Sequence, residues 1–383
     1  MAKQNKPAIR FKGFTDAWEQ RKLGEVFEEY SEKNHEELPP LTIIQGGGTI
    51  RRDESERSLQ YDKSSLSNYK MVNKDDFIVH LRSFEGGLEK ANSQGIISPA
   101  YHTFHGENVD SRFYYAYFRS KNFINKDLKP HVYGIRDGRS IDIEGMKTIK
   151  IPCTSYAEQK SIGDFLTTLD HLITLHQRKY DKLQVLKKAM LEKMFPKNGS
   201  SVPEIRFKGF TDAWEQRKLG DCFTERCESM PDGELISVTI NDGIKKFSEL
   251  GRHDNSNDDK SKYKKVCVGD IAYNSMRMWQ GASGCSPYEG IVSPAYTVLT
   301  PNSGINSKCM AYQFKLPATI HTFKINSQGI TSDNWNLKFP ALSEIEIYVS
   351  PYEQEQAKIA AYFANLDHLI TLHQRKFYVS ILV

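Results

Sequence analysis

The chain has 383 residues, of which 39% are hydrophobic and 26% charged, and its formal net charge is +4. This composition excludes a disordered polypeptide, and the lack of any run of roughly 18 apolar residues excludes a membrane-spanning one. The length fits about two domains, the small net charge argues against a large non-specific polyanion-binding surface, and the N-terminus has no signal-like apolar segment, so we expect a cytoplasmic protein.

The first element in chain order is a stretch that occurs twice. IRFKGFTDAWEQRKLG fills Ile9 to Gly24 and recurs, letter for letter, at Ile205 to Gly220. A second repeated stretch, LDHLITLHQRK, fills Leu169 to Lys179 and Leu366 to Lys376, and between the two only sparse anchors such as GIISPAY and GIVSPAY match. A period near 196 residues is too long for a solenoid, so the sequence predicts two tandem domains of one fold.

The segments between the repeated stretches indicate mixed α and β structure. DDFIVHL, GIISPAYHTF, GDIAYN and IVSPAYTVL are short, rich in β-branched and aromatic residues, and bounded by turn residues, as strands are. SRFYYAYFRSKNF, from Ser111, has aromatics at helical spacing. The polar and broken text NKDLKPHVYGIRDGRS that follows predicts an exposed loop.

Each domain ends in a long predicted helix. Ser155-x-x-Glu158 and Ser350-Pro351-x-Glu353 have the capping-box pattern, the second with Pro at the first helical position. Residues at steps of three and four, most of them apolar, then form the a/d seam of a coiled coil: Ile162, Leu166, Leu169, Ile173, His176, Tyr180, Leu183, Lys187, Met190 and Met194, and again Ile359, Phe363, Leu366, Ile370, His373 and Phe377. A helix of about forty residues, roughly 60 Å long, needs a partner. Two arrangements would provide one: either the two helices pack on each other, or each lies as an amphipathic helix on its own domain.

Signatures of catalysis are sparse. The Asn/Asp-Pro-Pro-aromatic loop of an adenine methyltransferase is missing, because the only Pro-Pro pair, Pro39-Pro40, lies in LPPL. GIRDGRS at Gly134 is one residue short of a phosphate-binding loop and has Arg in place of Lys. His102 and His105 would point to opposite faces of a strand, which makes them a poor metal pair.

Two features fit DNA binding. Basic and aromatic residues interleave from Arg112 to Arg139, which suits either phosphate contact and groove insertion or a buried aromatic core with a charged outer face. NSMRMWQG, from Asn274, carries Asn, Arg and Gln, which can read base edges in the major groove. HLRSFEGG, from His80, occupies the matching place in the first domain with different groups. An identical frame around such divergent inserts is expected if the frames meet one kind of partner and the inserts meet two DNA half-sites.

Two variable domains, each followed by Tyr-x-Glu-Gln and a Leu-Asp-x-Leu-Ile-x-Leu-x-x-Arg-Lys helix, resemble the specificity subunit of a type I restriction-modification enzyme over essentially the whole chain. The resemblance implies an α+β protein in which two tandem mixed α/β target recognition domains are separated by an antiparallel coiled coil of two long helices, with pseudo-two-fold symmetry. The implied divisions are a first recognition domain (1–154), a spacer helix (155–197), a second recognition domain (198–349) and a second helix (350–383). The conserved regions of the family fall on Ile9 to Gly24, Glu158 to Phe195, Ile205 to Gly220 and Glu355 to Lys376.

The resemblance also implies function and partners. Each recognition domain would read one half of a bipartite, asymmetric site in double-stranded DNA, and the helices would set the spacing. Two methyltransferase subunits and then motor-nuclease subunits would dock on the conserved regions and would carry S-adenosylmethionine, ATP and magnesium. This chain would have no catalytic residue, no metal, no cofactor and no membrane partner.

The residues expected to contact DNA come from the inserts. In the first domain they are Gln45, Arg51, Arg52, His80, Arg82, Ser83, Arg136 and Arg139, and in the second Asn241, Lys245, Asn274, Arg277, Trp279, Gln280 and Asn334. The residues expected in the helix seam or against a partner are Trp18, Leu166, Leu169, Ile173, His176, Tyr180, Leu183, Trp214, Phe363, Leu366, Ile370 and His373. Trp18 and Trp214 would brace each recognition domain against the helices or the methyltransferase.

One departure from the repeat concerns the end of the second helix. YDKLQVLKKAMLEKMFPK follows Lys179, whereas FYVSILV follows Lys376. We expect a second helix shortened by about fifteen residues, or about 22 Å, which would leave Met190 and Met194 short of partners. Two further classes of protein remain open: a coiled-coil scaffold without sequence-specific DNA binding, and a single-chain DNA modification enzyme.

Overall fold

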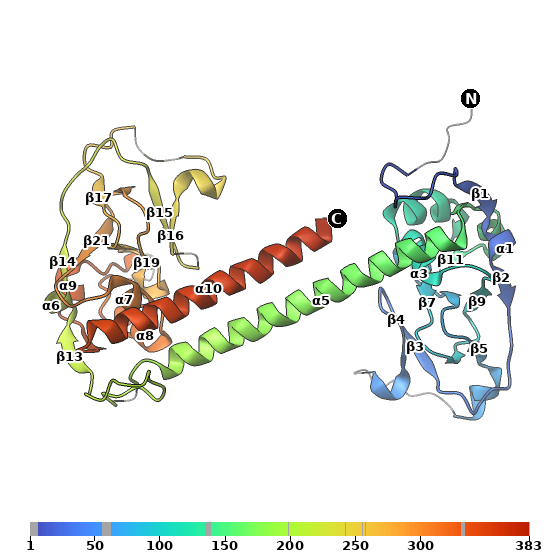
Figure 1. The fold of residues 1–383 in the computed structure, drawn as a ribbon, viewed down its shortest axis with the longest axis horizontal. Coiled ribbons are helices and arrows are strands. Elements are labelled where there is room, and N and C mark those ends of the chain that lie inside the picture. Colours follow the sequence, from blue (N-terminus) through green and yellow to red (C-terminus); the bar gives the residue numbers. More distant parts are fainter. Residues whose placement is uncertain are drawn as a thin grey trace. The chain divides into compact units, whose positions relative to one another are not determined.

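The computed structural model describes residues 7–55, 63–134, 139–197, 199–241, 243–254, 256, 258–330 and 334–382. The chain divides into two compact units, Met1–Leu172 and Ile173–Val383 (Figure 1). The division falls inside one long helix, α5 (Tyr156–Lys193), so the first half of this helix belongs to the first unit and the second half to the second unit.

The first unit alternates short strands with short helices. Its strands are β1 (Glu19–Lys22), β2 (Glu28–Tyr30), β3 (Leu41–Ile44), β4 (Gly48–Arg51), β5 (Lys70–Val72), β6 (Phe77–Val79), β7 (Glu89–Lys90), β8 (Gly95–Ile97), β9 (His102–His105), β10 (Val132–Tyr133), β11 (Ser140–Ile141) and β12 (Lys150–Cys153). Its helices are α1 (Leu23–Val26), α2 (Ser83–Gly86), α3 (Ser111–Phe118), α4 (Ile143–Lys147) and the start of α5.

The second unit has nearly the same order of elements. Its strands are β13 (Glu215–Lys218), β14 (Phe223–Glu225), β15 (Ile236–Thr239), β16 (Gly243–Lys246), β17 (Lys264–Val266), β18 (Ile271–Asn274), β19 (Ser283–Cys285), β20 (Gly290–Val292), β21 (Tyr296–Pro301) and β22 (Glu346–Val349). Its helices are the end of α5, α6 (Leu219–Cys222), α7 (Ser307–Gln313), α8 (Pro317–Ile325), α9 (Phe339–Ser343) and α10 (Glu353–Leu382).

The two units share one sheet topology. A four-stranded antiparallel sheet has the order β2-β9-β6-β7 in the first unit and β14-β21-β18-β19 in the second. The hairpins β3-β4 and β15-β16, and the pairs β5-β8 and β17-β20, also correspond. The expectation of two tandem domains of one fold is confirmed by this match, which leaves only the β10-β11 pair without a counterpart among the described strands.

In each unit, the repeated first stretch pairs with the segment just before the long helix. β1 lies antiparallel to β12, with Glu19 opposite Cys153, and β13 lies antiparallel to β22, with Glu215 opposite Val349. The start of each domain is therefore joined to its end, and the segments that differ between the two domains lie between the paired strands β1 and β12 or β13 and β22.

The aromatic residues that follow Ser111 form the core of the first unit. Tyr114, Phe118 and Phe123 are fully buried, and Tyr114 packs edge-on against Phe27 with ring centroids 5.0 Å apart. Of the two alternatives for this basic and aromatic stretch, the structure therefore supports the core. The exposed loop predicted after it is wrong in part, because Phe123–Leu128 forms a π-helical turn with Phe123 and Leu128 buried, and β10 pairs with β11.

The two long helices begin at corresponding positions, and the predicted capping box forms by half at the first start and not at the second. At the first start the Ser155 hydroxyl accepts from the Glu158 amide at 3.4 Å, while the Glu158 side chain bonds elsewhere. At the second start Pro351 lies outside the helix, which begins at Glu353, so the expectation of Pro at the first helical position is wrong. The Ser350 hydroxyl instead accepts from the Tyr352 amide at 3.1 Å and donates to Glu355 at 2.5 Å.

The second half of α5 packs antiparallel on α10 (Figure 1). His176 contacts His373, with 3.0 Å between the two Nδ1 atoms, and Lys187 forms an ion pair with Asp367 at 2.5 Å. Phe195 stacks on Phe363 with ring centroids 6.2 Å apart. The predicted packing of the two helices on each other is confirmed.

Two details of the helix pair refine the expectations. His176 and His373 occupy the same place in the repeated stretch and touch each other, which two antiparallel helices allow only where a local two-fold axis passes between them.

Met194 is buried and Met190 packs against the same apolar cluster, together with Trp214 and Phe363. The expectation that these methionines lack partners is wrong, because the second domain itself covers them.

Candidate nucleic-acid interface

The segment between β6 and β7 forms a tight turn followed by α2, and only part of it faces solvent. His80 and Ser83 are buried, and the Ser83 hydroxyl accepts from the His80 amide at 2.9 Å. Burial lowers the pKa of His80, so its imidazole is held neutral. These two expected DNA-contacting residues support the turn, whereas Arg82 between them is exposed.

Arg82 and Arg139 meet on the outer side of α2. Arg82 donates to Glu85 at 3.0 Å, and the Arg139 guanidinium lies 4.4 Å from the centre of the Phe84 ring and 3.9 Å from Glu85. Both guanidinium groups are exposed, and a guanidinium is the side-chain group best suited to bind phosphate or guanine.

The glycine-rich hairpin between β3 and β4 places Gln45 next to the same helix. A side chain at Gly86 would meet the Gln45 amide nitrogen at 2.3 Å, so the Gln45 side chain lies directly against α2. Gly46 and Gly48 have positive φ angles of 83° and 73° and donate their amides to Glu89 at 2.7 and 3.1 Å. Gln45, Arg82 and Arg139 thus form one exposed group around α2.

The remaining candidates of the first domain lie apart from this group. Arg51 makes a bidentate ion pair with Asp53, at 3.0 and 2.7 Å, at the far end of β4. Arg52 lies 5.4 Å from the centre of the Tyr69 ring. Arg136 lies outside the described residues.

In the second domain the turn after β18 carries a different set of groups. The Asn274 side chain accepts from the Met276 amide at 3.0 Å, and the exposed Arg277 donates to Gln280 at 3.3 Å. Trp279 donates its indole N–H to the Met276 carbonyl at 3.0 Å.

Asn334 reaches this turn through its neighbour. Trp335 packs edge-on against Trp279 with centroids 5.3 Å apart, and the Leu337 amide donates to the Ser275 carbonyl at 2.9 Å. The exposed Asn334 therefore belongs to a segment that packs on this turn. The exposed Asn241 is at the tip of the β15-β16 hairpin, and Lys245 is half-buried along β16.

Three residues that the sequence did not single out as contacts organise these turns. Glu89 is fully buried and accepts from Arg119 and, at 2.7 Å, from the Tyr115 hydroxyl. In the second domain Lys315 donates to the carbonyls of Ile240 and Gly281 at 2.9 and 2.5 Å. Arg119 and Lys315 stand 196 residues apart, so aligning the two repeats would have shown a basic residue at one place in both domains.

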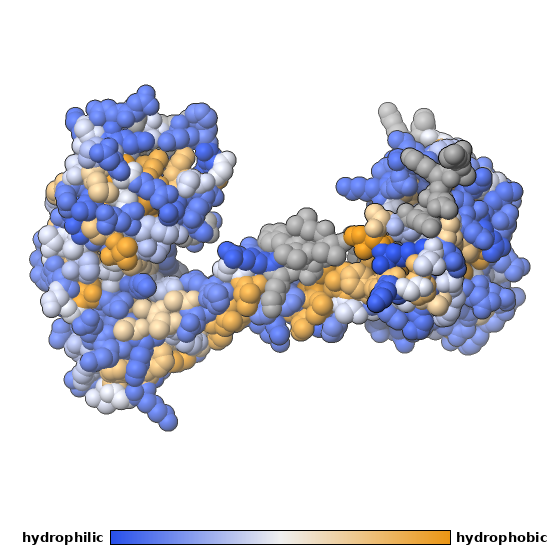
Figure 2. All heavy atoms as spheres, turned by 45° about the horizontal axis from the view of Figure 1, so that its top comes forward, coloured by the Kyte–Doolittle hydropathy of each residue, from blue (hydrophilic) through white to orange (hydrophobic). Residues whose placement is uncertain are grey.

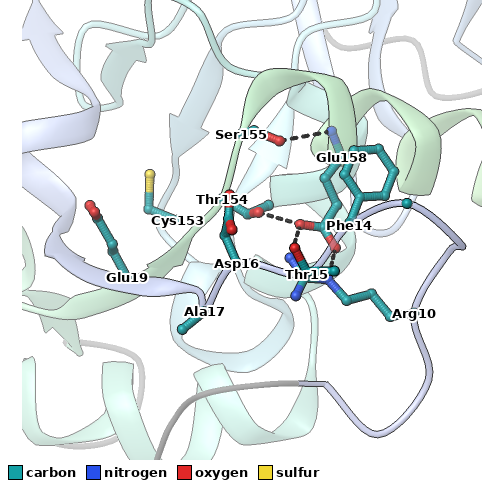
Figure 3. A pocket seen from close by; sticks show the side chains of 11 residues that line it. Arg10, Phe14, Thr15, Asp16, Ala17, Glu19, Cys153, Thr154, Ser155 and Glu158 are labelled. Atoms are coloured by element: carbon teal, nitrogen blue, oxygen red, sulfur yellow. Dashed lines mark hydrogen bonds and ion pairs between the residues drawn. The ribbon is translucent and has the colours of Figure 1, made fainter.

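A buried ion pair locks the two ends of each domain together. Arg10 donates to Glu158 at 2.5 and 2.7 Å (Figure 3). Trp18 donates to the same carboxylate at 3.1 Å. The second copy repeats the fork, with Arg206 donating to Glu355 at 2.6 and 2.9 Å. Burial acts to raise the pKa of Glu158, but the hydrogen bonds from Arg10, Thr154 and Trp18 outweigh it, so the pKa lies below its usual value.

The hollow beside the first ion pair is lined by both ends of the domain. Arg10 and Asp16 come from the first stretch, Thr154 lies just before α5, and Glu158 lies in its first turn (Figure 3). Since Arg10 and Thr154 both donate to Glu158, we assign the hollow a role in the joint between the first stretch and the start of α5.

The two tryptophans play unequal parts in this joint. Trp18 packs edge-on on Phe113 at 5.5 Å while it bonds to Glu158. Trp214 is buried against Phe195 at 5.9 Å, and its indole nitrogen has no hydrogen-bond partner among the described residues. Trp18 therefore braces α5 by a hydrogen bond, and Trp214 braces the helix pair by packing.

The helix pair also has an apolar outer surface (Figure 2). Leu175, Leu369 and Leu372 remain between 37% and 40% exposed, although the seam residues Leu366 and Ile370 beside them are buried. Leu175 and Leu372 are equivalent across the local axis between His176 and His373, so they lie on one face of the pair. Exposed leucines in such a row are typical of a protein-protein contact.

The chemistry available to the described residues is that of recognition. Exposed Arg, Asn and Gln side chains gather at two turns, and within the described ranges no group of three metal-ligating side chains occurs. No helix in the described part of the chain is long and apolar enough to cross a membrane.

Two domains of one fold, with different polar groups on matching turns and with packed long helices, define a class of modular recognition protein. The chain belongs to the family of the type I restriction modification DNA specificity domain, whose model matches residues 15–185 and 211–378. The resemblance seen in the sequence is thus confirmed.

Solved structures with this architecture have distant sequences. The S subunit of a type-I restriction-modification system from M. genitalium is 14% identical with a TM-score of 0.53, and the match covers 95% of this chain and 93% of that one. The HsdS subunit from Thermoanaerobacter tengcongensis is 15% identical with a TM-score of 0.47, over 95% and 94% of the two chains. The likeness to the M. genitalium subunit supports the fold.

Proposed function

We propose that each domain reads one half of a bipartite, asymmetric site in double-stranded DNA. The observation that carries the proposal is the contrast between the matching turns. Gln45, Arg82 and Arg139 are exposed in the first domain, whereas Arg277 and Asn334 are exposed in the second. Arg is suited to guanine and Asn or Gln to adenine, so two such surfaces would select different sequences.

The helices supply the spacing and the docking surface in this proposal. Because equivalent residues of the two helices, His176 and His373, meet at a local two-fold axis, the helix pair would offer equivalent surfaces to two partners. The exposed face with Leu175 and Leu372 suits two equivalent methyltransferase subunits, and motor-nuclease subunits would bind the complex they form. S-adenosylmethionine, ATP and magnesium would belong to these partners, so this chain would be a non-catalytic subunit working in the cytoplasm.

The test is to produce the chain with its methyltransferase and to sequence the modified adenines. We expect one split, asymmetric motif with a fixed gap, and salt-dependent DNA binding that is strong only in the complex. Exchange of residues 220–345 for the insert of another domain should change only one half of the motif.

Two outcomes would overturn the proposal. Modification without a split motif, or DNA binding without sequence preference, would instead fit a coiled-coil scaffold. Binding of S-adenosylmethionine by the isolated chain would instead fit a single-chain modification enzyme.

A further inference from the structure

Each domain carries its exposed polar groups on two separate turns. One is the β3-β4 or β15-β16 hairpin, and the other follows β6 or β18. A hairpin tip and a strand-to-helix turn would move independently unless something joined them. In both domains a basic residue shortly after α3 or α7 forms the joint.

In the first domain the joint is an ionic cradle. Arg119 donates to the buried carboxylate of Glu89, whose oxygens also accept the amides of Gly46 and Gly48 at 2.7 and 3.1 Å. The Arg119 guanidinium also reaches the hairpin, since a side chain at Gly46 would meet its Nη2 at 3.0 Å. Gln45 is thereby held against α2.

In the second domain the joint is a single lysine. The Lys315 ammonium donates to the carbonyl of Ile240, next to Asn241, and to the carbonyl of Gly281, next to Gln280. One side chain therefore links the two turns by backbone hydrogen bonds that do not depend on the residues displayed at their tips. Arg119 and Lys315 thus occupy equivalent positions and both join the hairpin to the neighbouring turn. Arg119 does so through a buried carboxylate, and Lys315 does so through backbone carbonyls.

We infer that Arg119 and Lys315 are positioning residues for DNA recognition: each locks the hairpin to the neighbouring turn, so that groups from both read one half-site as a single surface. The inference rests on the proposed function. Discrimination between bases needs side chains fixed in register with the base edges, because a mobile loop pays an ordering cost and adapts to wrong bases as well. Neither residue needs to touch DNA for this role.

The test uses Lys315→Met in the full chain with its methyltransferase. We expect preference at the half-site read by the second domain to fall about tenfold at one or more positions, with the other half-site unchanged. Lys315→Arg, which retains the charge and donors, should restore most of the preference. Lys308→Met, which removes an exposed lysine from the preceding helix α7, should leave both halves as they were.

The readouts separate the possible failures. If the unaltered complex gives no split motif, the proposed function fails, and if it gives one that Lys315→Met does not relax, the positioning role fails. Equal loss at both half-sites would indicate general unfolding or lost phosphate contact and would also overturn the inference. If Lys315→Met does not fold, Arg119→Lys in the first domain decides, because loss of the guanidinium contact should relax only the other half-site.

Discussion

The buried fork between Arg206 and Glu355 gives the sharpest test of how the domain is closed. Arg206→Met would leave the fully buried Glu355 carboxylate with only the Ser350 hydroxyl, at 2.5 Å, in place of a bidentate cation. Removal of one partner from a buried pair costs about 3–5 kcal/mol, and since Ser350 still donates we expect about 3 kcal/mol. This loss of stabilising free energy should be local, at the contact between the β13-β22 strand pair and α10 that the Arg206–Glu355 ion pair holds together.

Hydrogen exchange measures this locally. If the joint opens as a unit, about 3 kcal/mol corresponds to roughly 100-fold faster exchange of the β13 and β22 amides. The chain offers a matched control, because Arg10→Met makes the same change in an identical stretch and should speed exchange at β1 and β12 instead. Unchanged exchange at β13 and β22 in Arg206→Met, or equal effects in both domains from either substitution, would refute the reasoning.

Three further predictions follow from the same contacts. Because the folded pKa of Glu158 lies below its usual value, its contribution to stability should be present above about pH 4.5 and be lost as the pH falls through the folded pKa; thermal melts of Glu158→Gln and the unaltered chain should converge there. Arg277→Ala should relax one base position of one half-site by about 1–3 kcal/mol, and mapping that shows an unchanged motif would remove Arg277 from the interface. Leu372→Asp should weaken methyltransferase binding about tenfold or more in calorimetry while thermal stability stays the same, whereas equal affinity would place the docking surface elsewhere.

Repeats and periodicity predicted the architecture because they report on the whole chain. Two identical heads and two identical tails allow only a duplicated fold, and the a/d seam allows only a long packed helix. The error at Pro351 has a local cause. The Ser350 hydroxyl accepts from the Tyr352 amide and donates to Glu355, so Ser350 does not cap the helix as the pattern predicts, and α10 begins at Glu353.

The sequence does not predict which side chains of the two turns are exposed, because residue type determines what a side chain can bind and not where it points. His80 and Ser83 stand beside Arg82 in the sequence, yet they are buried and Arg82 is not. Likewise, Leu128 lies in the core although the segment from Asn125 onward is mostly polar, because a polar segment needs only one buried face to fold onto a domain. Burial depends on tertiary contacts that no local pattern contains.

The Arg–Glu ion pair, present in both domains, gives a further reason why parts of the repeated stretches are identical. A shared partner outside the chain would explain conservation of exposed residues, but Arg10 and Arg206 are largely buried and bind Glu158 and Glu355 of their own domains. A change in Arg10 or in Glu158 therefore needs a matching change in its partner, and the same holds for Arg206 and Glu355. The insert closes on a fixed pair of strands whatever its own sequence, so its turns can diverge while the joint is kept. Most other residues of the repeated stretches are exposed, and for these a shared partner remains the reason for identity.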